Sequence, residues 1–436
     1  MYIKSAEITN IRSVEKFKIE FSNPAGWHVL IGDNGAGKST IIRSIALALV
    51  GPEEALGLRA DWKDWLNRQS EEGEIILSIE SGDMDQHSGQ SAKLKNKFIP
   101  NIISFKKNKE AVSFTTNKTK KTENGTQKAA NGVPDPMRFN WGHGKGWFSV
   151  AYGPYRRFAG GNQEWTKVYY TQPKLGAHLS AFGEDVALTE AIEWLVKLNY
   201  QQLEGDTSAG IIIQDIQKLV NSADFLPHKA EIESISSEGV MFKDGNGSFI
   251  HVNQLSDGYR SILSMTFELI RQLVRVYSPD EVFKAIRSGV MKIDMPGVVL
   301  IDEIDAHLHP TWQTRIGQWF TKYFPQIQFI VTTHSPLICR ACEKGSIWRL
   351  AAPGTENVSG EVKGIERNQL IFGNVLDAYG TEIFGTEVTI SKESVEMKEK
   401  LVALNNKNEL NPLPDSEMNE LKQLRLIFST DAPTSL

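Results

Sequence analysis

One short stretch constrains the fold of this chain more than any other, because it fits the pattern Gly-x4-Gly-Lys-Ser/Thr. The stretch reads Gly32-Asp33-Asn34-Gly35-Ala36-Gly37-Lys38-Ser39-Thr40. It follows an apolar run at 27–31, which is typical of a buried strand, and precedes an apolar helix predicted over 39–50. A strand, a glycine-rich turn and a helix in this order form a phosphate-binding loop. The chain is therefore predicted to have an α/β fold with a mixed sheet flanked by helices.

The residue types in this loop suit a nucleotide. Glycines let backbone N–H groups turn inward around the β-phosphate, and the helix N-terminus adds the positive end of its dipole. Lys38 is expected to reach the β- and γ-phosphates, and the Ser39 hydroxyl is expected to bind Mg²⁺. The predicted nucleotide-binding residues of the loop are Asn34, Gly35, Ala36, Gly37, Lys38, Ser39 and Thr40.

A second candidate site residue pair follows the apolar run 298–301, which predicts another buried strand. The run ends in Asp302-Glu303, at the strand end where open α/β sheets bind their ligands. We expect Asp302 to hold Mg²⁺ and Glu303 to polarise the attacking water as a general base. An apolar run that ends in two acids is common by itself, so its meaning depends on the phosphate-binding loop.

The stretch Leu255-Ser256-Asp257-Gly258-Tyr259-Arg260-Ser261 resembles the LSGGQ-type signature of ABC ATPases in a degenerate LSxGxR form. Ser256 is predicted to be the N-cap of a long helix over 257–277. In the family, this helix end binds the γ-phosphate of ATP held by a second head. The resemblance therefore implies ATP and Mg²⁺ as ligands, and a head-to-head dimer completed by Ser256 and Gly258. An ordinary N-cap with a turn glycine is the alternative.

Three further marks of that family occur in order. Ile304 to Pro310 stands where the family has its D-loop, which implies that Asp305 lies at the nucleotide. His334 follows a predicted buried strand at 328–332, where the family has a switch histidine that contacts the γ-phosphate. Arg12 lies in an N-terminal strand that resembles the RecF, SMC and OLD branch, where this arginine lies near nucleotide. The D-loop also accounts for His307 and His309, so we do not interpret them as metal ligands.

Within that branch, three motifs look most like the ATPase subunit of Septu-type antiphage systems, which also accompanies some retrons. The motifs are Tyr152 to Arg157, Asp257 to Ser261 and Glu303 to Gln313. The resemblance implies an HNH-type nuclease partner for which the ATPase acts as sensor and scaffold. It also implies a nucleotide-proximal Arg156, although a surface turn built by Gly153-Pro154 explains that position equally simply. The rival function is a stand-alone RecF-like DNA-repair ATPase. An ABC transporter subunit does not suit the split domain.

The predicted organisation has a nucleotide-binding head split by an insertion. We expect the following segments: 1–85 and 253–364 for the two parts of the head, 86–138 for a basic flexible insertion, 139–252 for a mixed insertion that ends in a hairpin, and 365–436 for a helical region. The insertion shows no sustained heptads, unlike the coiled coil of SMC proteins. The helical region is a candidate for partner docking, and a solvated helical cap is the alternative.

The basic insertion is the one candidate for contact with DNA or RNA. Between Lys93 and Lys128 the sequence has ten lysines against two acids, whereas the whole chain has a net charge of −5. Clustered lysines on a loop neutralise phosphates without reading sequence. A solvated insertion is the alternative interpretation, and the composition does not decide between them.

The sequence lacks features that several classes of protein need, and those classes are therefore disfavoured. A Toprim nuclease needs a Glu and an Asp-x-Asp pair, but after His334 the remaining Asp377, Asp415 and Asp431 form no such pair, so no nuclease activity is predicted. Cys339 and Cys342 have no partner pair for zinc and are predicted to be buried small side chains. With no signal-peptide pattern and no membrane-length apolar run, we expect a cytoplasmic protein without a membrane partner.

Overall fold

The computed structural model describes two units of the chain, Met1–Phe372 and Gly373–Leu436, and each is treated by itself. The described residues are 1–55, 62–86, 98–108, 111–116, 120–121, 127–128, 134–142, 145–155, 168, 171–183, 190–226, 230–352, 354, 358–373, 392–410 and 412–427. Arg156, Asp377 and Asp431, which the sequence analysis singled out, lie outside these ranges.

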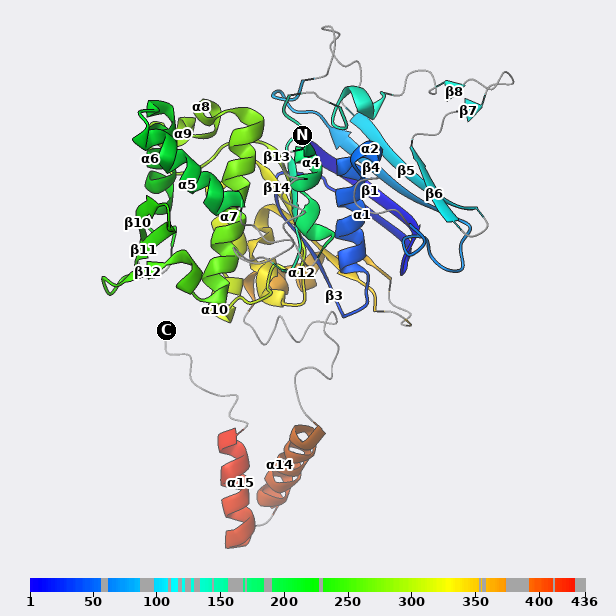
Figure 1. Ribbon diagram of the computed structural model, residues 1–436. Coiled ribbons are helices and arrows are strands. Elements are labelled where there is room, and N and C mark those ends of the chain that lie inside the picture. The colour runs from blue at the N-terminus through cyan, green and yellow to red at the C-terminus, as the bar shows by residue number, and fades with distance from the viewer. Residues whose placement is uncertain are drawn as a thin grey trace. The chain divides into compact units, whose positions relative to one another are not determined.

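A six-stranded sheet forms the centre of the first unit, with the order β16-β15-β3-β14-β13-β9 (Figure 1). Neighbouring strands are parallel except for the β15–β16 pair. The strands are β3 (Gly26–Gly32), β9 (Ser149–Tyr152), β13 (Gly297–Ile301), β14 (Ile327–Thr333), β15 (Gly345–Leu350) and β16 (Gly360–Glu361). Every residue of β3, β13 and β14 is buried, which agrees with their mostly apolar sequences.

A second, five-stranded antiparallel sheet has the order β2-β1-β4-β5-β6. Its strands alternate buried and exposed side chains, as expected of a sheet that faces the core on one side. They are β1 (Tyr2–Ile11), β2 (Val14–Glu20), β4 (Glu72–Glu80), β5 (Phe98–Asn108) and β6 (Ala111–Thr116). The last two extend the sheet into the basic segment, which was predicted as a flexible insertion. A separate pair, β7 (Lys120–Lys121) and β8 (Gln127–Lys128), follows.

Helix α1 (Lys38–Val50) packs against both sheets and fills the main core. Nearly all of its residues are buried, because the apolar sequence between Thr40 and Val50 leaves no polar stripe for solvent. Its position directly after β3 places the start of the helix at the carboxyl edge of the six-stranded sheet. The predicted α/β fold, with a mixed sheet flanked by helices, is confirmed.

A helical lobe surrounds the long helix α7 (Asp257–Tyr277), whose bounds agree with the sequence prediction (Figure 1). Beside it lies a three-stranded sheet with the predicted hairpin, β10 (Glu231–Ser236), β11 (Gly239–Lys243) and β12 (Phe249–His251). Other helices of the first unit are α2 (Pro52–Ala55), α4 (Pro173–Gly176), α5 (Glu190–Leu203), α6 (Thr207–Val220), α8 (Pro279–Val282), α9 (Lys284–Arg287), α10 (Pro310–Gln313), α11 (Ile316–Tyr323) and α12 (Gly364–Phe372).

Four 3-10 segments occur among the described residues, and one of them, η5 (Pro336–Lys344), carries the two cysteines of the chain. Both thiols are free and buried, and burial raises the pKa of each above its ordinary value. Such thiols favour the neutral form, which is a poor metal ligand. Among the described residues, no group of three or more His, Cys, Asp or Glu side chains is arranged to hold a metal ion.

The second unit contains α14 (Lys392–Leu410) and α15 (Asp415–Ile427). The two helices pack through a small apolar cluster that includes Leu404 and Leu421. Ion pairs join them at the surface, for example Lys407 with Glu417 at 2.7 Å. Helix α12 belongs to the first unit, although the sequence analysis grouped it with this region. In the described part of the chain, no helix has the length and apolarity needed to cross a membrane.

Candidate functional site

The phosphate-binding loop connects β3 to α1 and is open to solvent at Asn34 and Gly35. Its conformation explains two of its glycines. Gly35 and Gly37 have φ values of +81° and +90°, in the left-handed region that other residues rarely adopt. A Cβ on Gly37 would also lie 2.8 Å from Val14 Cγ2, so the turn before β2 presses against the loop. Glycine at 37 is therefore required by both backbone and packing.

Lys38 begins α1 and points back toward the loop. Its Nζ donates to the carbonyl oxygens of Gly32 at 2.8 Å and Asp33 at 2.9 Å, and its side chain is 5% exposed. Burial lowers the pKa of Lys38 below its ordinary value, and the nearby carboxylates of Asp302 and Glu303 partly offset that effect. The phosphate-binding loop thus places the cationic Lys38 side chain near the carboxylates of Asp302 and Glu303.

Asp302 and Glu303 follow β13 at the same sheet edge. The Asp302 carboxylate is 1% exposed, and its Oδ1 accepts a hydrogen bond of 2.6 Å from Thr332 Oγ1. The backbone N–H of Glu303 donates to the same hydroxyl at 2.7 Å. Glu303 has a φ of +49°, a conformation that costs a non-glycine residue energy and that clusters at functional sites. The sequence analysis assigned no role to Thr332, although a polar residue in a buried strand was a visible signal.

His334 comes immediately after β14 and completes this group. Its Nδ1 lies 3.4 Å from Lys38 Nζ, and its backbone N–H donates to Asp305 Oδ2 at 3.4 Å. The ends of β3, β13 and β14 therefore bring together five residues predicted from the sequence. We call this group the P-loop edge, and its members are Lys38, Asp302, Glu303, Asp305 and His334.

The P-loop edge offers ligands that fit Mg²⁺. A carboxylate from Asp302 and a hydroxyl from Ser39 are hard oxygen donors, which Mg²⁺ prefers. Ser39 is half-buried at the start of α1, directly after Lys38. Mg²⁺ at nucleotide sites needs only one or two protein carboxylates, since phosphates and water supply the other ligands. The absence of a larger acidic cluster among the described residues is therefore compatible with such a site.

The signature turn, Ser256 to Gly258, lies apart from the P-loop edge. Ser256 occupies the N-cap position of α7 as predicted, but its side chain is exposed and makes no capping hydrogen bond. A Cβ on Gly258 would lie 3.1 Å from the carbonyl oxygen of His307. The turn thus rests against the segment that follows Asp305, and the Ser256 hydroxyl is open to solvent.

Arg12 lies in the turn between β1 and β2, with a φ of +50°. Its guanidinium donates to Asp64 Oδ2 at 2.9 Å and lies 5.0 Å from the centre of the Trp65 ring. Arg12 and Asp64 line a cavity of about 410 Å³. The turn contacts the phosphate-binding loop through Val14, but the role of Arg12 toward nucleotide stays a prediction.

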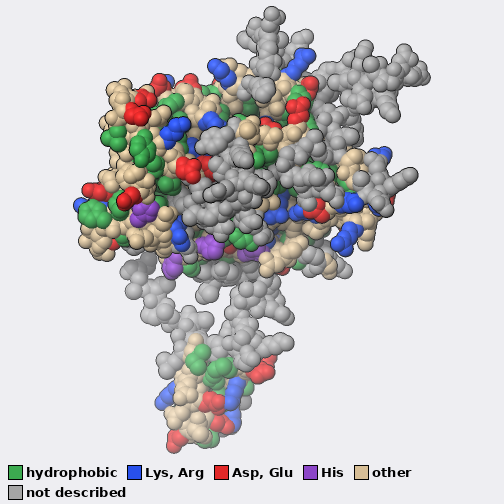
Figure 2. Space-filling model, viewed as in Figure 1, with side chains coloured by type: hydrophobic (Ala, Val, Ile, Leu, Met, Phe, Trp, Pro, Cys, Tyr) green, Lys and Arg blue, Asp and Glu red, His purple; other side chains and the backbone are tan. Residues whose placement is uncertain are grey.

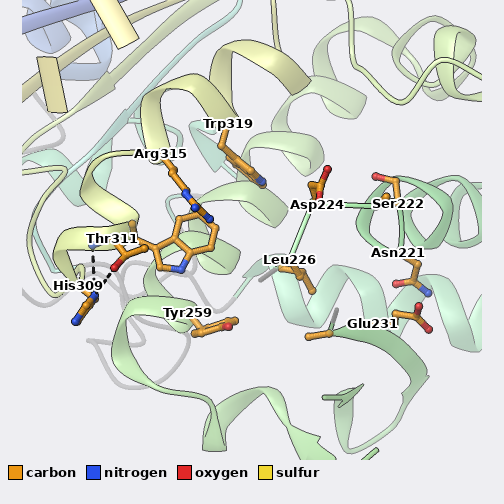
Figure 3. A pocket seen from close by; sticks show the side chains of 13 residues that line it. Asn221, Ser222, Asp224, Leu226, Glu231, Tyr259, His309, Thr311, Arg315 and Trp319 are labelled. Atoms are coloured by element: carbon orange, nitrogen blue, oxygen red, sulfur yellow. Dashed lines mark hydrogen bonds between the residues drawn. The ribbon is translucent and has the colours of Figure 1, made fainter. Parts of the chain in front are cut away.

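A larger cavity of about 1100 Å³ adjoins the signature turn (Figure 3). Tyr259 from the first turn of α7 lines it together with residues around α10 and α11, and Arg315 and Trp319 are among these. Asp224 and Glu231 line the opposite side. The Tyr259 ring contacts the Trp312 ring edge to face at 6.5 Å, so this wall joins α7 to the segment after the D-loop.

This site geometry agrees with the sequence family. The model of a family described as "AAA domain" matches residues 5–244, which is more than half of the chain. The chain belongs to this AAA domain family. A second model, described as "AAA domain, putative AbiEii toxin, Type IV TA system", matches residues 183–340. The first match includes the phosphate-binding loop and the second includes the signature turn and the rest of the P-loop edge.

Two curated relatives are named as a Septu protein and a retron ATPase. The chain is 27% identical to "Septu protein PtuA" of Bacillus mycoides (strain KBAB4), over 79% of this chain and 40% of that protein. It is 38% identical to "Retron Ec83 probable ATPase" of Escherichia coli, over 29% of this chain and 22% of that protein. The chain thus spans less than half the length of these relatives. Among solved structures, the SmcHead bound to the C-winged helix domain of ScpA has 15% identity, a TM-score of 0.46, and coverage of 85% of this chain and 99% of that chain.

The sequence matches confirm the predicted resemblance to Septu and retron ATPases. The AAA domain family is one of ATPases, which agrees with the residues at the P-loop edge.

Proposed function

We propose that this protein binds and hydrolyses ATP, dimerises through its nucleotide sites, and regulates or scaffolds a partner nuclease in antiphage defence. One observation carries the enzymatic part. The cation of Lys38, the carboxylates of Asp302 and Glu303, and His334 converge at the carboxyl ends of three parallel strands, beside an open glycine-rich loop. Ligands bind at this edge in open α/β sheets.

Four members of the P-loop edge, together with Ser39, have roles in the proposed reaction. Lys38 exchanges its bonds to the loop carbonyls for oxygens of the β- and γ-phosphates. Asp302 and Ser39 hold Mg²⁺, which neutralises charge on the phosphates when it is bound. Glu303 accepts the proton of the attacking water. His334 hydrogen-bonds the γ-phosphate, since its ring lies beside Lys38.

The signature turn supports a site shared between two copies. The Ser256 hydroxyl is exposed and has no capping bond, so it is available to a ligand held by another molecule. The first N–H groups of a 21-residue helix favour an anion near that turn. In the dimer that we propose, Ser256 and Gly258 of one head close over the γ-phosphate bound by the other. Asp305 lies at the same boundary, next to His334.

The role in defence rests on the relatives, one of them named a Septu protein and the other a retron ATPase. We propose that the partner is an HNH-type nuclease, and that ATP binding and hydrolysis change how the two heads hold it. The helical unit of α14 and α15 is a candidate docking element. This chain itself is proposed to have no nuclease activity, so cleavage depends on the partner.

The rival function is a stand-alone repair ATPase that grips DNA through the basic segment. Two described lysines of that segment, Lys106 and Lys107, form ion pairs with Glu72 and Glu71 at 2.8 and 3.2 Å. On the face drawn in Figure 2, acidic and basic side chains of the described residues are interspersed. Both observations weaken the case for a phosphate-tracking surface, because DNA binding depends on concentrated positive charge.

The proposal is tested in two steps. Purified protein should hydrolyse ATP in the presence of Mg²⁺, and Lys38→Ala should abolish both binding and hydrolysis. Tagged protein expressed from its native locus should then retain an HNH-type nuclease in fixed proportion, identified by mass spectrometry. Hydrolysis without a nuclease, together with salt-sensitive DNA binding that is lost on removal of 93–128, would favour the repair ATPase. A protein that neither binds nor hydrolyses ATP would refute both functions.

A further inference from the structure

We infer that Thr332 is a positioning residue of the ATP site, whose one hydroxyl sets both the Asp302 carboxylate and the Glu303 backbone. The inference rests on the proposed ATPase function and goes beyond it, because it assigns the geometry of the metal ligand and the general base to a third residue. Thr332 lies on β14, the strand between β3 and β13, and its side chain is fully buried.

The direction of the two hydrogen bonds follows from the groups involved. An ionised carboxylate only accepts hydrogen bonds, so Thr332 Oγ1–H donates to Asp302 Oδ1 at 2.6 Å. A backbone N–H only donates, so Glu303 N–H donates to the lone pairs of the same oxygen at 2.7 Å. The hydroxyl thus uses its proton for Asp302 and one lone pair for Glu303. The bond to Asp302 has the length expected when a hydroxyl donates to a carboxylate, and the bond from Glu303 N–H lies at the short end of the range for N–H···O bonds.

The bond to Glu303 has a second consequence, because that residue has a φ of +49°. The left-handed region costs a residue with a Cβ roughly 1–2 kcal/mol, so neighbouring contacts must hold it there. The next residue is held by the same strand, since Ile304 N–H donates to the Thr332 carbonyl oxygen at 3.0 Å. The side chain and the carbonyl oxygen of Thr332 therefore both accept hydrogen bonds from the turn that carries the Glu303 carboxylate.

The adjacent threonine shows that this arrangement is particular to position 332. Thr333 is equally buried, yet its hydroxyl accepts from Ser335 N at 2.9 Å and faces the turn after the strand. The two threonines share residue type, strand and burial, and differ in what their hydroxyls contact. Thr333 therefore provides a matched control for removing a buried hydroxyl from β14.

The first expected consequence is weaker binding of Mg²⁺, and slower hydrolysis of ATP comes second. Removing a residue that hydrogen-bonds a metal ligand typically weakens metal binding by about 10–100-fold. In Thr332→Val the shape of the side chain is kept, but the Asp302 oxygen and the Glu303 N–H lose this partner. The Mg²⁺ concentration that gives half-maximal nucleotide binding should rise by that factor. Thr332→Ser keeps the hydroxyl and should stay within about threefold of the wild type.

The experiment titrates Mg²⁺ against binding of a fluorescent ATP analogue to the full chain. Wild type, Thr332→Val, Thr332→Ser and Thr333→Val are compared, after melting curves confirm that each is folded. A rise of about 10–100-fold in the half-maximal Mg²⁺ concentration in Thr332→Val alone, with a near-wild-type value in Thr332→Ser, supports the inference. An unchanged titration in Thr332→Val, or an equal rise in Thr333→Val, overturns it. If the wild type shows no Mg²⁺-dependent binding, the proposed ATP site has failed instead.

A second readout addresses Glu303. In Thr332→Val at saturating Mg²⁺ and ATP, kcat should fall about tenfold or more while KM changes little, because the general base is misplaced and substrate contacts remain. A rise in KM alone would contradict the link to Glu303. If Thr332→Val does not fold, Thr332→Cys replaces it. Its thiol is a weak hydrogen-bonding group, so an intermediate shift in the Mg²⁺ titration is expected, and a wild-type titration would overturn the inference.

Discussion

The P-loop edge and the signature turn belong to the same proposed site, but the structure holds them differently. Lys38 hydrogen-bonds to the carbonyl oxygens of its own loop, Asp302 is held by Thr332 of the neighbouring strand, and His334 lies 3.4 Å from Lys38. Ser256 is exposed, and its side chain makes no capping hydrogen bond. One half is thus organised within the chain, and the other is open to a second molecule. The difference is what a composite site requires, as proposed above, and the predictions below test each half in turn.

The largest effect is expected at the P-loop edge. Glu303→Gln removes the general base but keeps the size of the side chain, so hydrolysis should fall by about 10²–10⁴-fold. ATP binding should persist, because Lys38 and Asp302 are unchanged. The dimer should become more stable, since the phosphate that joins the heads is no longer cleaved. Radiolabelled phosphate release and sedimentation with ATP measure the two effects. Wild-type turnover in this variant would remove Glu303 from its proposed role.

A smaller but sharper effect is expected at the signature turn. Ser256→Arg places a large side chain where the second head should close, so hydrolysis should fall on the order of a hundredfold. Binding of ATP to the isolated chain should change little, because the P-loop edge does not contact Ser256. Equilibrium binding and hydrolysis are measured on the same preparation. An equal loss of ATP binding would show that Ser256 acts within its own chain, which contradicts a composite site.

Two glycine substitutions compare the halves directly. Gly37→Ala should destabilise the fold by about 2 kcal/mol and remove ATP binding, because φ is +90° and a Cβ would meet Val14 at 2.8 Å. Gly258→Ala should change stability by less than about 1 kcal/mol, since it lies in a helix and a Cβ there would be 3.1 Å from His307 O. Urea unfolding measures both. Equal losses of stability would remove the contrast between a fixed and an open half.

The smallest effect is expected at Glu190 of α5, in the helical lobe that contains α7. Burial raises the pKa of Glu190 to about 7, with a further contribution from Glu268, whereas Arg271 opposes the rise. The pKa of this carboxyl is higher in the folded protein than in the unfolded chain. Its contribution to stability is therefore fully present at pH values below the unfolded pKa, and it is lost as the pH rises through the folded pKa of about 7. Glu190→Gln should therefore be more stable than wild type by about 1–2 kcal/mol at pH 8, and similar at pH 5.

Thermal melts at both values of pH test this expectation. Glu193→Gln, an exposed change on the same helix, is the control and should leave the melting temperature unchanged at either pH. If Glu190→Gln is no more stable than wild type at pH 8, the ionised Glu190 carboxylate does not destabilise the fold beside α7. The contrast between the buried part of α7 and its exposed N-terminus would then be smaller than we propose.

The sequence predicted much of the fold because its strongest patterns are local. Apolar runs before Gly32 and Asp302 indicated buried strands, and the structure has β3 and β13 there. The helix predicted over 257–277, with Ser256 as its N-cap, agrees with the bounds of α7. The pairing of β5 with β4 and of β6 with β5 was harder to predict, because the lysines of this segment dominate its composition and its alternation of apolar and polar residues is weak.

The sequence predicted which residues belong to the site better than it predicted the contacts between them. Lys38, Asp302 and His334 each follow a recognisable motif, and the parallel strands bring them together. Thr332 escaped notice because its role depends on which hydroxyl of β14 faces β13, and that is a matter of tertiary register. The missing side-chain cap at Ser256 has the same origin, since a sequence shows the N-cap residue type and not its rotamer.

Complementation between two inactive variants tests the composite site most directly. Lys38→Ala lacks a working phosphate-binding loop but keeps its signature turn, and Ser256→Arg has the opposite defect. Each variant alone should be almost inactive. When the two are mixed in equal amounts, about half of the dimers should be mixed, each with one of two sites intact, so about a quarter of wild-type hydrolysis should return. A mixture that remains as inactive as its components would contradict the central claim that two heads complete one site.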